Sequence, residues 1–163
     1  EGQFAAKFRL CSKQSAKKLK VKKSHLTSEQ KMLWQEFQRE HLAIELTGEL
    51  QTFGEHLYLL PLGLPDLSKL KIARNGLHLG VFKKKRFEPS FALGLALKPS
   101  EVKHIIEIDE EQFKKYVAGE TVNLNQNPAN GWYQVVVQGN GLGFAKVTGN
   151  ILKNYFPKGL RFQ

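Results

Sequence analysis

The sequence has a single cysteine, Cys11, and so it cannot form a disulfide within the chain. One thiol is typical of proteins from a reducing compartment, and we expect the cytoplasm. No second cysteine or nearby histidine accompanies Cys11 to make a metal site or a nucleophilic dyad, so we interpret it as an unreactive thiol. The histidines, at positions 25, 41, 56, 78 and 104, have no ligand spacing, and no metal site is predicted.

Long apolar runs are also absent. No stretch approaches the ~18 apolar residues that a membrane helix requires, so we expect no membrane partner. The first residues lack a charged head followed by an apolar segment, and we expect no secretion signal. Hydrophobic residues make up 41% of the chain and charged residues 25%, which are ordinary values for a folded protein. A length of 163 residues is sufficient for one or two compact domains.

Apart from Glu1, acidic residues are missing from both ends of the chain. Residues 2–28 contain eight bases and no acid, and no acid occurs after Glu120. Six of the fifteen acids lie in residues 101–120 instead. Basic ends with a net charge of +10 suit a polyanionic partner, although such a charge could also serve solubility alone.

The chain opens with the alternating pattern of a strand over residues 2–10. Because no turn precedes this strand, we expect a piece whose own sheet lies elsewhere, and an exposed edge that pairs with another strand. Residues 11–27 are rich in lysine and serine and are interpreted as a basic linker.

A small α+β unit is expected over residues 28–73. Thr27 and Gln30 have the spacing of a capping box, and the apolar residues that follow recur at near-helical spacing, which predicts a helix over about 28–42. Two apolar segments then flank Gly54-Glu55 and predict a β-hairpin.

Residues 74–97 contain the most distinctive pattern in the chain. Asn75-Gly76 predicts a turn, and the alternation after it predicts a strand that runs into four consecutive cations, Lys83–Arg86. Pro89 suits the first position of a helix. The apolar residues from 91 to 97 are too dense for a solvated loop. The stretch is therefore expected to be a strand, a basic corner and a buried helix or strand.

The remainder of the chain predicts further strands and a helix. A short strand is expected over 104–108, followed by a helix capped by Asp109 with Gln112 and ended at Gly119. Two strands flanking Gly139-Asn140-Gly141 predict a second hairpin. Residues 151–155 are interpreted as one helical turn, stopped by Pro157.

The sequence offers basic residues, rather than a catalytic motif, as its functional candidates. The glycines of 139–143 lie between two expected strands, whereas a phosphate-binding loop leads from a strand into a helix. No Ser/His/Asp set and no paired buried carboxylates emerge, so no catalytic residue is predicted. Basic strands without a recognition helix suit folded RNA better than a DNA groove. The candidate RNA-binding residues are Arg74, Lys83, Lys84, Lys85, Arg86, Lys146, Lys153, Asn154, Lys158 and Arg161.

Three segments resemble a known family. They are EGQFAAKFRL, LYLLPLGLPDLSKLKIARNGLHLGVFKKKRFEPSFALGLAL and GLGFAKVTGNILKNYFPKGLR. Together they resemble the C-terminal half of bacterial RsmF (YebU-type) 16S rRNA cytosine-C5 methyltransferases, which belong to the NOL1/NOP2/Sun class of RNA methyltransferases. The resemblance covers essentially the whole chain and is most specific in 74–97, and in 142–146 taken with 152–161.

This resemblance implies an α+β fold in which a small α/β domain, 28–73, is followed by a PUA-like β-barrel domain, 74–163, that binds RNA. Residues 1–10 would be the last strand of the family's methyltransferase domain. The family's S-adenosylmethionine pocket and two catalytic cysteines belong to that domain, and Cys11 matches neither cysteine. We therefore expect this chain to bind no cofactor and not to be an enzyme, whereas its full-length parent would be an rRNA methyltransferase.

The leading hypothesis is a non-catalytic module that positions 16S rRNA, and not DNA, for the methyltransferase domain. The alternative is a structural or protein-interaction domain that docks on its own methyltransferase domain in cis, or on a ribosomal protein, with its basic surface merely solvated. A third hypothesis, that the chain is itself an enzyme, would require methyl transfer by the isolated chain.

Overall fold

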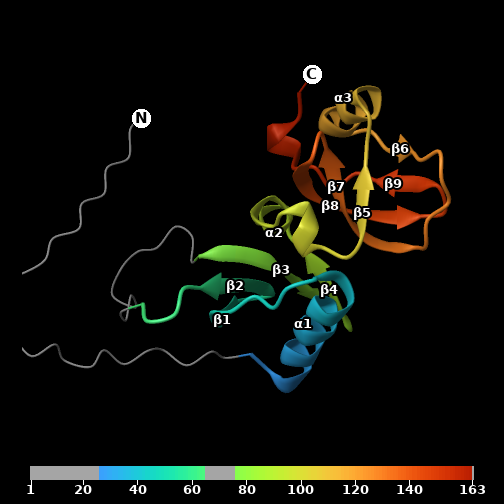
Figure 1. The fold of residues 1–163 in the computed structure, drawn as a ribbon. Coiled ribbons are helices and arrows are strands. Elements are labelled where there is room, and N and C mark those ends of the chain that lie inside the picture. The colour runs from blue at the N-terminus through green and yellow to red at the C-terminus, as the bar shows by residue number, and fades with distance from the viewer. Residues whose placement is uncertain (1–25, 65–75, 163) are drawn as a thin grey trace, which may run out of the picture.

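The computed structural model describes residues 26–64 and 76–162, which form two sheets with three α-helices packed around them (Figure 1). Five of the features expected from the sequence lie wholly or partly outside these residues. They are the strand over 2–10, most of the linker, Cys11, Arg74 and the turn at Asn75-Gly76.

The chain enters the fold through helix α1 (Ser28–His41), which begins with the predicted capping box. The Gln30 amide N donates to Thr27 Oγ1 at 3.2 Å, and Gln30 Oε1 accepts from the Thr27 amide at 3.0 Å. Two of the backbone N–H groups that a helix start leaves unpaired are thereby satisfied. The predicted helix is confirmed, and its buried face carries Trp34 and Phe37.

The first sheet has the order β1-β2-β3-β4 and is antiparallel throughout. Its strands are β1 (Glu49–Phe53), β2 (His56–Leu60), β3 (Leu77–Lys83) and β4 (Arg86–Pro89). The hairpin at Gly54-Glu55 is confirmed. The sheet crosses the boundary expected at residues 73 and 74, because β2 pairs with β3. Leu57 and Leu79 of these two strands are fully buried in one core, so 76–97 folds together with the segment before it.

The basic corner is the turn of the β3–β4 hairpin. Lys83 and Arg86 are cross-strand partners, and Lys84 and Lys85 form the turn between them. Pro89 does not begin a helix as expected but ends β4. Helix α2 (Phe91–Ala96) is capped instead by Ser90, whose Oγ accepts from the Leu93 amide at 3.0 Å.

The second sheet has the order β5-β7-β8-β9-β6, in which only the β5–β7 pair is parallel. Its strands are β5 (Ile105–Glu107), β6 (Val122–Asn123), β7 (Gly131–Val137), β8 (Asn140–Thr148) and β9 (Ile151–Lys153). Helix α3 (Glu110–Ala118) has the predicted Asp109–Gln112 capping box and ends at Gly119, whose φ is 94°. Two 3-10 helices, η1 (Pro99–Glu101) and η2 (Lys158–Leu160), complete the elements.

The helical turn expected over 151–155 is wrong, since residues 151–153 form strand β9. Gly149, with φ of 62°, and Asn150 make a tight turn that returns the chain along β8. Glycine adopts positive φ without steric cost, so this turn favours a hairpin over a helix. The consequence is that residues 151–153 lie beside residues 146–148.

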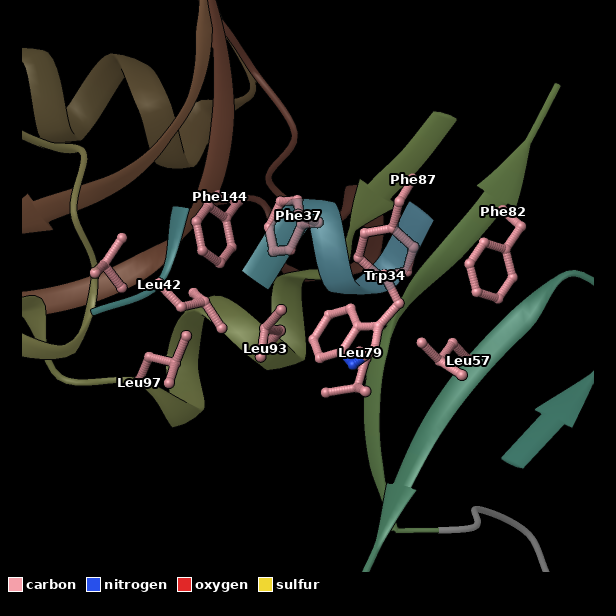
Figure 2. Close-up of a cluster of buried hydrophobic side chains, with 11 residues drawn as sticks. Trp34, Phe37, Leu42, Leu57, Leu79, Phe82, Phe87, Leu93, Leu97 and Phe144 are labelled. Carbon is pink, nitrogen blue, oxygen red and sulfur yellow. The ribbon is translucent and has the colours of Figure 1, made fainter. Parts of the chain in front are cut away.

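Two hydrophobic cores meet at helix α2. The first core lies between α1 and the first sheet, and it also contains Leu93 of α2 and Phe144 of β8 (Figure 2). The second core lies under the second sheet and contains Tyr116 of α3 and Leu152 of β9. Helix α2 therefore lies between the sheets and contacts both (Figure 1). The α+β class expected from the sequence is confirmed.

Candidate nucleic-acid interface

Strand pairing places an aromatic and two cationic residues in one row across the second sheet. Trp132 of β7 is the cross-strand partner of Lys146 of β8, and Lys146 is the partner of Lys153 of β9. Directly opposed residues point to the same face, with Cβ atoms about 4.5–5.5 Å apart. We call Trp132, Lys146 and Lys153 the basic row.

The basic row lies on the face of the second sheet opposite the second core, beyond the part of that face where Phe144 and Gln134 are buried against the first unit. Side chains alternate along a strand, and Ala145 and Val147, which flank Lys146, are fully buried in the second core. Leu152, which precedes Lys153, is buried there as well. Lys153 is exposed and Lys146 is half-buried. The sheet thus holds two ammonium groups toward solvent on a rigid frame.

The two lysines of the row have no opposite charge beside them. Among residues 26–64 and 76–162, neither takes part in an ion pair or a side-chain hydrogen bond. Like charges that lie directly opposite each other on a sheet are destabilising, by up to about 1 kcal/mol. A surface that accepts this cost is suited to an anionic ligand.

An exposed tyrosine extends the row. The ring centroids of Trp132 and Tyr155 are 4.8 Å apart and the ring planes meet at 65°, which is an edge-to-face contact. The Tyr155 side chain is 42% exposed. Burial raises the pKa of its phenol, and the charge of Glu88 raises that pKa further, whereas Arg86 lowers it. Tyr155 therefore lies near the β3–β4 hairpin as well as near the basic row.

The cations of that hairpin are only partly engaged by acids. Lys83 forms an ion pair with Glu55 at 3.4 Å, and Arg86 forms one with Glu88 at 2.9 Å. The Lys83–Glu55 pair is exposed, and an exposed pair contributes about 0–1 kcal/mol and exchanges easily for another anion. The turn residues Lys84 and Lys85 are exposed and make no ion pair within the described part of the chain.

Two candidate residues are engaged within the protein. Asn154 Nδ2 donates to the carbonyl oxygens of Tyr116 and Glu120, at 2.6 and 2.8 Å. These bonds tie the segment after β9 to the end of α3. The Arg161 guanidinium packs so closely on Gly119 that a Cβ there would lie 2.5 Å from it. This position suits a cation, because a helix carries partial negative charge at its C-terminus.

Lys158 is the remaining candidate and is exposed on η2. The structure thus brings Lys146 and Lys153 together. Arg86 of the β3–β4 hairpin lies near the same surface, because its charge acts on the phenol of Tyr155. Trp132 and Tyr155 are not among the residues predicted from the sequence to bind RNA. The alternation of Ile151, Leu152 and Lys153 could have indicated a strand at this point. A strand there pairs with residues 146–148 and places Lys153 opposite Lys146.

Two further features of the described residues are a glycine-rich turn and a groove at the start of helix α3. Gly139 and its neighbours join β7 to β8 in a hairpin, as expected, and do not lead into a helix. A groove at the start of α3 is lined by Glu107 and Glu110 among others, but Asp109 and Gln112 are already used in capping the helix. Within the same residues, no three metal-binding side chains converge, and no helix is long and apolar enough to cross a membrane.

Comparison with known proteins accounts for both sheets. The family model for the RsmF rRNA methyltransferase first C-terminal domain matches residues 36–97. The model for the methyltransferase RsmF PUA domain matches residues 103–162. This chain belongs to the RsmF family. The RsmF models divide the chain between residues 97 and 103, where the structure passes from the first sheet to the second.

The predicted RsmF resemblance and the PUA-like fold of the second sheet are both confirmed. A curated RsmF relative, ribosomal RNA small subunit methyltransferase F of Shewanella oneidensis, is 35% identical over 122 residues. The match covers 73% of this chain and 26% of the relative. The chain therefore spans about a quarter of the length of that RsmF protein, in its C-terminal domains.

Proposed function

We propose that these two domains are the non-catalytic, RNA-binding part of a cytoplasmic, S-adenosylmethionine-dependent rRNA cytosine-C5 methyltransferase. In this proposal they hold 16S rRNA so that a methyltransferase domain of the same protein reaches its cytosine. The observation that supports it best is the opposed pair Lys146 and Lys153, which has no counter-charge.

Phosphate groups offset the repulsion between these two lysines. RNA carries regularly spaced charges, and each phosphate neutralised by a lysine releases condensed counterions into solution. No acidic residue occurs after Glu120, so β7, β8 and β9 present no carboxylate that would repel the backbone. The relative's description as a ribosomal RNA methyltransferase supports rRNA as the polyanion.

Chemistry is assigned to the parent protein rather than to these domains. S-adenosylmethionine would supply the methyl group in the methyltransferase domain. The described residues contribute binding and orientation, through the basic row and the turn cations Lys84 and Lys85. We propose no role in the reaction for any of them.

Fluorescence anisotropy tests the proposal. Binding of the 163-residue chain to a labelled, structured 16S rRNA fragment is measured from low to high salt. We expect affinity to fall as salt rises, and Lys153→Glu to weaken binding and reduce the salt slope by roughly one unit. Lys31→Glu provides the control. It also lowers the net charge of the protein by two, but Lys31 lies on α1, away from β9 (Figure 1).

Two results would contradict the proposal. Binding that is indifferent to salt and to Lys153→Glu would remove the electrostatic basis. Equal losses for Lys153→Glu and Lys31→Glu would show a response to net charge rather than a defined surface. A chain that binds no RNA but binds the separately produced methyltransferase domain would instead favour the structural role.

A further inference from the structure

We propose that Trp132 and Tyr155 form a stacking site for an unpaired RNA base, with Lys146 and Lys153 holding the flanking phosphates. This inference rests on the proposed function and deepens it. It identifies single-stranded RNA, rather than a duplex, as the ligand of the basic row and Tyr155.

The aromatic pair is not accounted for by the hydrophobic cores. Trp132 is partly buried and packs against the first core without being one of its buried members, and Tyr155 belongs to neither core. The centroids of the two rings are 4.8 Å apart, and Tyr155 is 42% exposed. The phenol of Tyr155 is not seen to form a hydrogen bond with any residue that the structure describes. A large, rigid ring is thus presented to solvent with one side supported.

The cations lie at the right place to complement these rings. Lys146 is directly opposite Trp132, and Lys153 is two residues from Tyr155 and opposite Lys146. Proteins that bind single strands combine a positively charged track for the backbone with aromatic rings on which bases stack. Duplex RNA keeps its bases inside, so it would engage the lysines and leave the rings unused.

The surface continues toward the β3–β4 hairpin. Arg86 and Glu88 are close enough to Tyr155 for their charges to act on its phenol. The negative charge of Glu88 is balanced by Arg86, whose Nε lies 2.9 Å from the Glu88 carboxylate. A strand bound at Tyr155 would therefore be within reach of the charge of Arg86 as well as of the basic row.

Affinity for two RNAs distinguishes stacking from charge. The probes are a labelled single-stranded RNA of eight nucleotides and a blunt duplex of the same sequence, each titrated with the full 163-residue chain. We expect Tyr155→Ala to weaken binding of the single strand by about fivefold or more, the loss of one stacked base. The duplex affinity should not change, and Tyr155→Phe should retain most of the affinity for the single strand.

Tryptophan fluorescence gives a second readout, and its main measurement uses the unaltered chain. Trp34 is 1% exposed in the first core and cannot stack on a base, so Trp132 is the reporter. Saturating single-stranded RNA should quench the emission of the unaltered chain. The Trp132→Phe variant should not show this quenching when its emission is measured at RNA concentrations that saturate the variant. Thermal unfolding of each variant shows whether its fold is retained.

The outcomes separate this inference from the proposed function. If Lys153→Glu weakens both RNAs but Tyr155→Ala weakens neither, or weakens both equally, the base site is overturned while RNA binding stands. Emission that does not respond to the single strand overturns the base site as well. If the chain binds neither RNA, both the inference and the proposed function fail.

Discussion

Gly94 in α2 lies directly against Gly143 in β8, so closely that a Cβ atom on Gly94 would be 2.4 Å from the Gly143 Cα. Gly143 itself has φ of 124°, a backbone conformation that other residues rarely adopt. Two glycines are thus required at the point where the helix of the first unit meets the sheet of the second. This contact fixes the β3–β4 hairpin, which leads into α2, relative to the basic row.

Replacing Gly94 by alanine should destabilise the protein. Alanine has the better helix propensity, by about 1 kcal/mol, but the added methyl group would meet backbone atoms that cannot move aside. We expect a loss in the upper part of the 1–3 kcal/mol range that is typical of overpacking. Denaturant unfolding of Gly94→Ala measures it. Gly159→Ala is the control, because no atom lies within 4 Å of a Cβ at that position, and it should be nearly neutral.

Gln134 provides a second test of the same joint. Its side chain is fully buried in β7, and Nε2 donates to the carbonyl oxygens of Gly94 and Leu97, both at 2.8 Å. In Gln134→Glu the donor is lost, and each buried carbonyl left unpaired costs about 1–3 kcal/mol.

The defect of Gln134→Glu should grow with pH. Burial beside two carbonyl oxygens raises the pKa of the introduced carboxyl above the usual value of about 4.3, so the folded state binds a proton more tightly than the unfolded chain does. Stability is then highest below the unfolded pKa and decreases as pH rises. Unfolding at pH 5 and at pH 8 measures the difference. The exposed Gln35→Glu, on α1, should show little of it.

Local patterns were sufficient to predict the elements whose signals are short-range. The capping boxes at Thr27 and Asp109 and the glycine at the end of α3 each act within one helical turn, and all three are confirmed. Hairpins around Gly54 and Gly139 were predicted for the same reason. The pairing of β2 with β3 was not, because it joins segments that are about twenty residues apart and depends on a shared core.

The candidate site shows the same division. Lysines can be recognised in a sequence, but whether two of them oppose each other depends on strand register. The mistaken helical turn at 151–155 concealed the Lys146–Lys153 pair. Asn154 was selected for its hydrogen-bond donors, and those donors bind the end of α3, a long-range contact that no local pattern reveals. Domain limits were misplaced for a related reason, because β3 completes a sheet begun before residue 64.

His41 should make stability depend on pH in the mildly acidic range. It is 7% exposed, and burial lowers the pKa of its imidazole. Glu40 opposes this shift, whereas His104 and Lys103 add to it. The unfolded chain then takes up a proton near pH 6.5 that the folded state resists, so stability is complete above that pH and falls as pH decreases through it.

Thermal unfolding between pH 7.5 and pH 5.5 checks the role of His41. The midpoint should decrease over this interval in the unaltered chain, and it should decrease less in His41→Leu, which keeps an apolar contact with Phe37. An equal decrease in both proteins would assign the dependence to other groups.

The opposed lysines predict a substitution that improves stability while it impairs binding. Lys146→Glu would replace a repulsive cross-strand pair with an attractive one, because Lys153 lies directly opposite. Cross-strand pairs of this kind contribute about 0.2–1 kcal/mol each, so the free energy of unfolding should rise by about that amount, most clearly at low salt. Affinity for RNA should fall at the same time, since a cation that faces the phosphates becomes an anion. Denaturant unfolding and anisotropy on one protein preparation measure both effects.

Lys146→Gln separates them, because it removes the repulsion without adding an attraction and should give a smaller gain in stability and a smaller loss of affinity. A variant that is less stable than the unaltered chain would show that Lys146 contributes packing that outweighs the repulsion, and the cost attributed to the pair would then be absent.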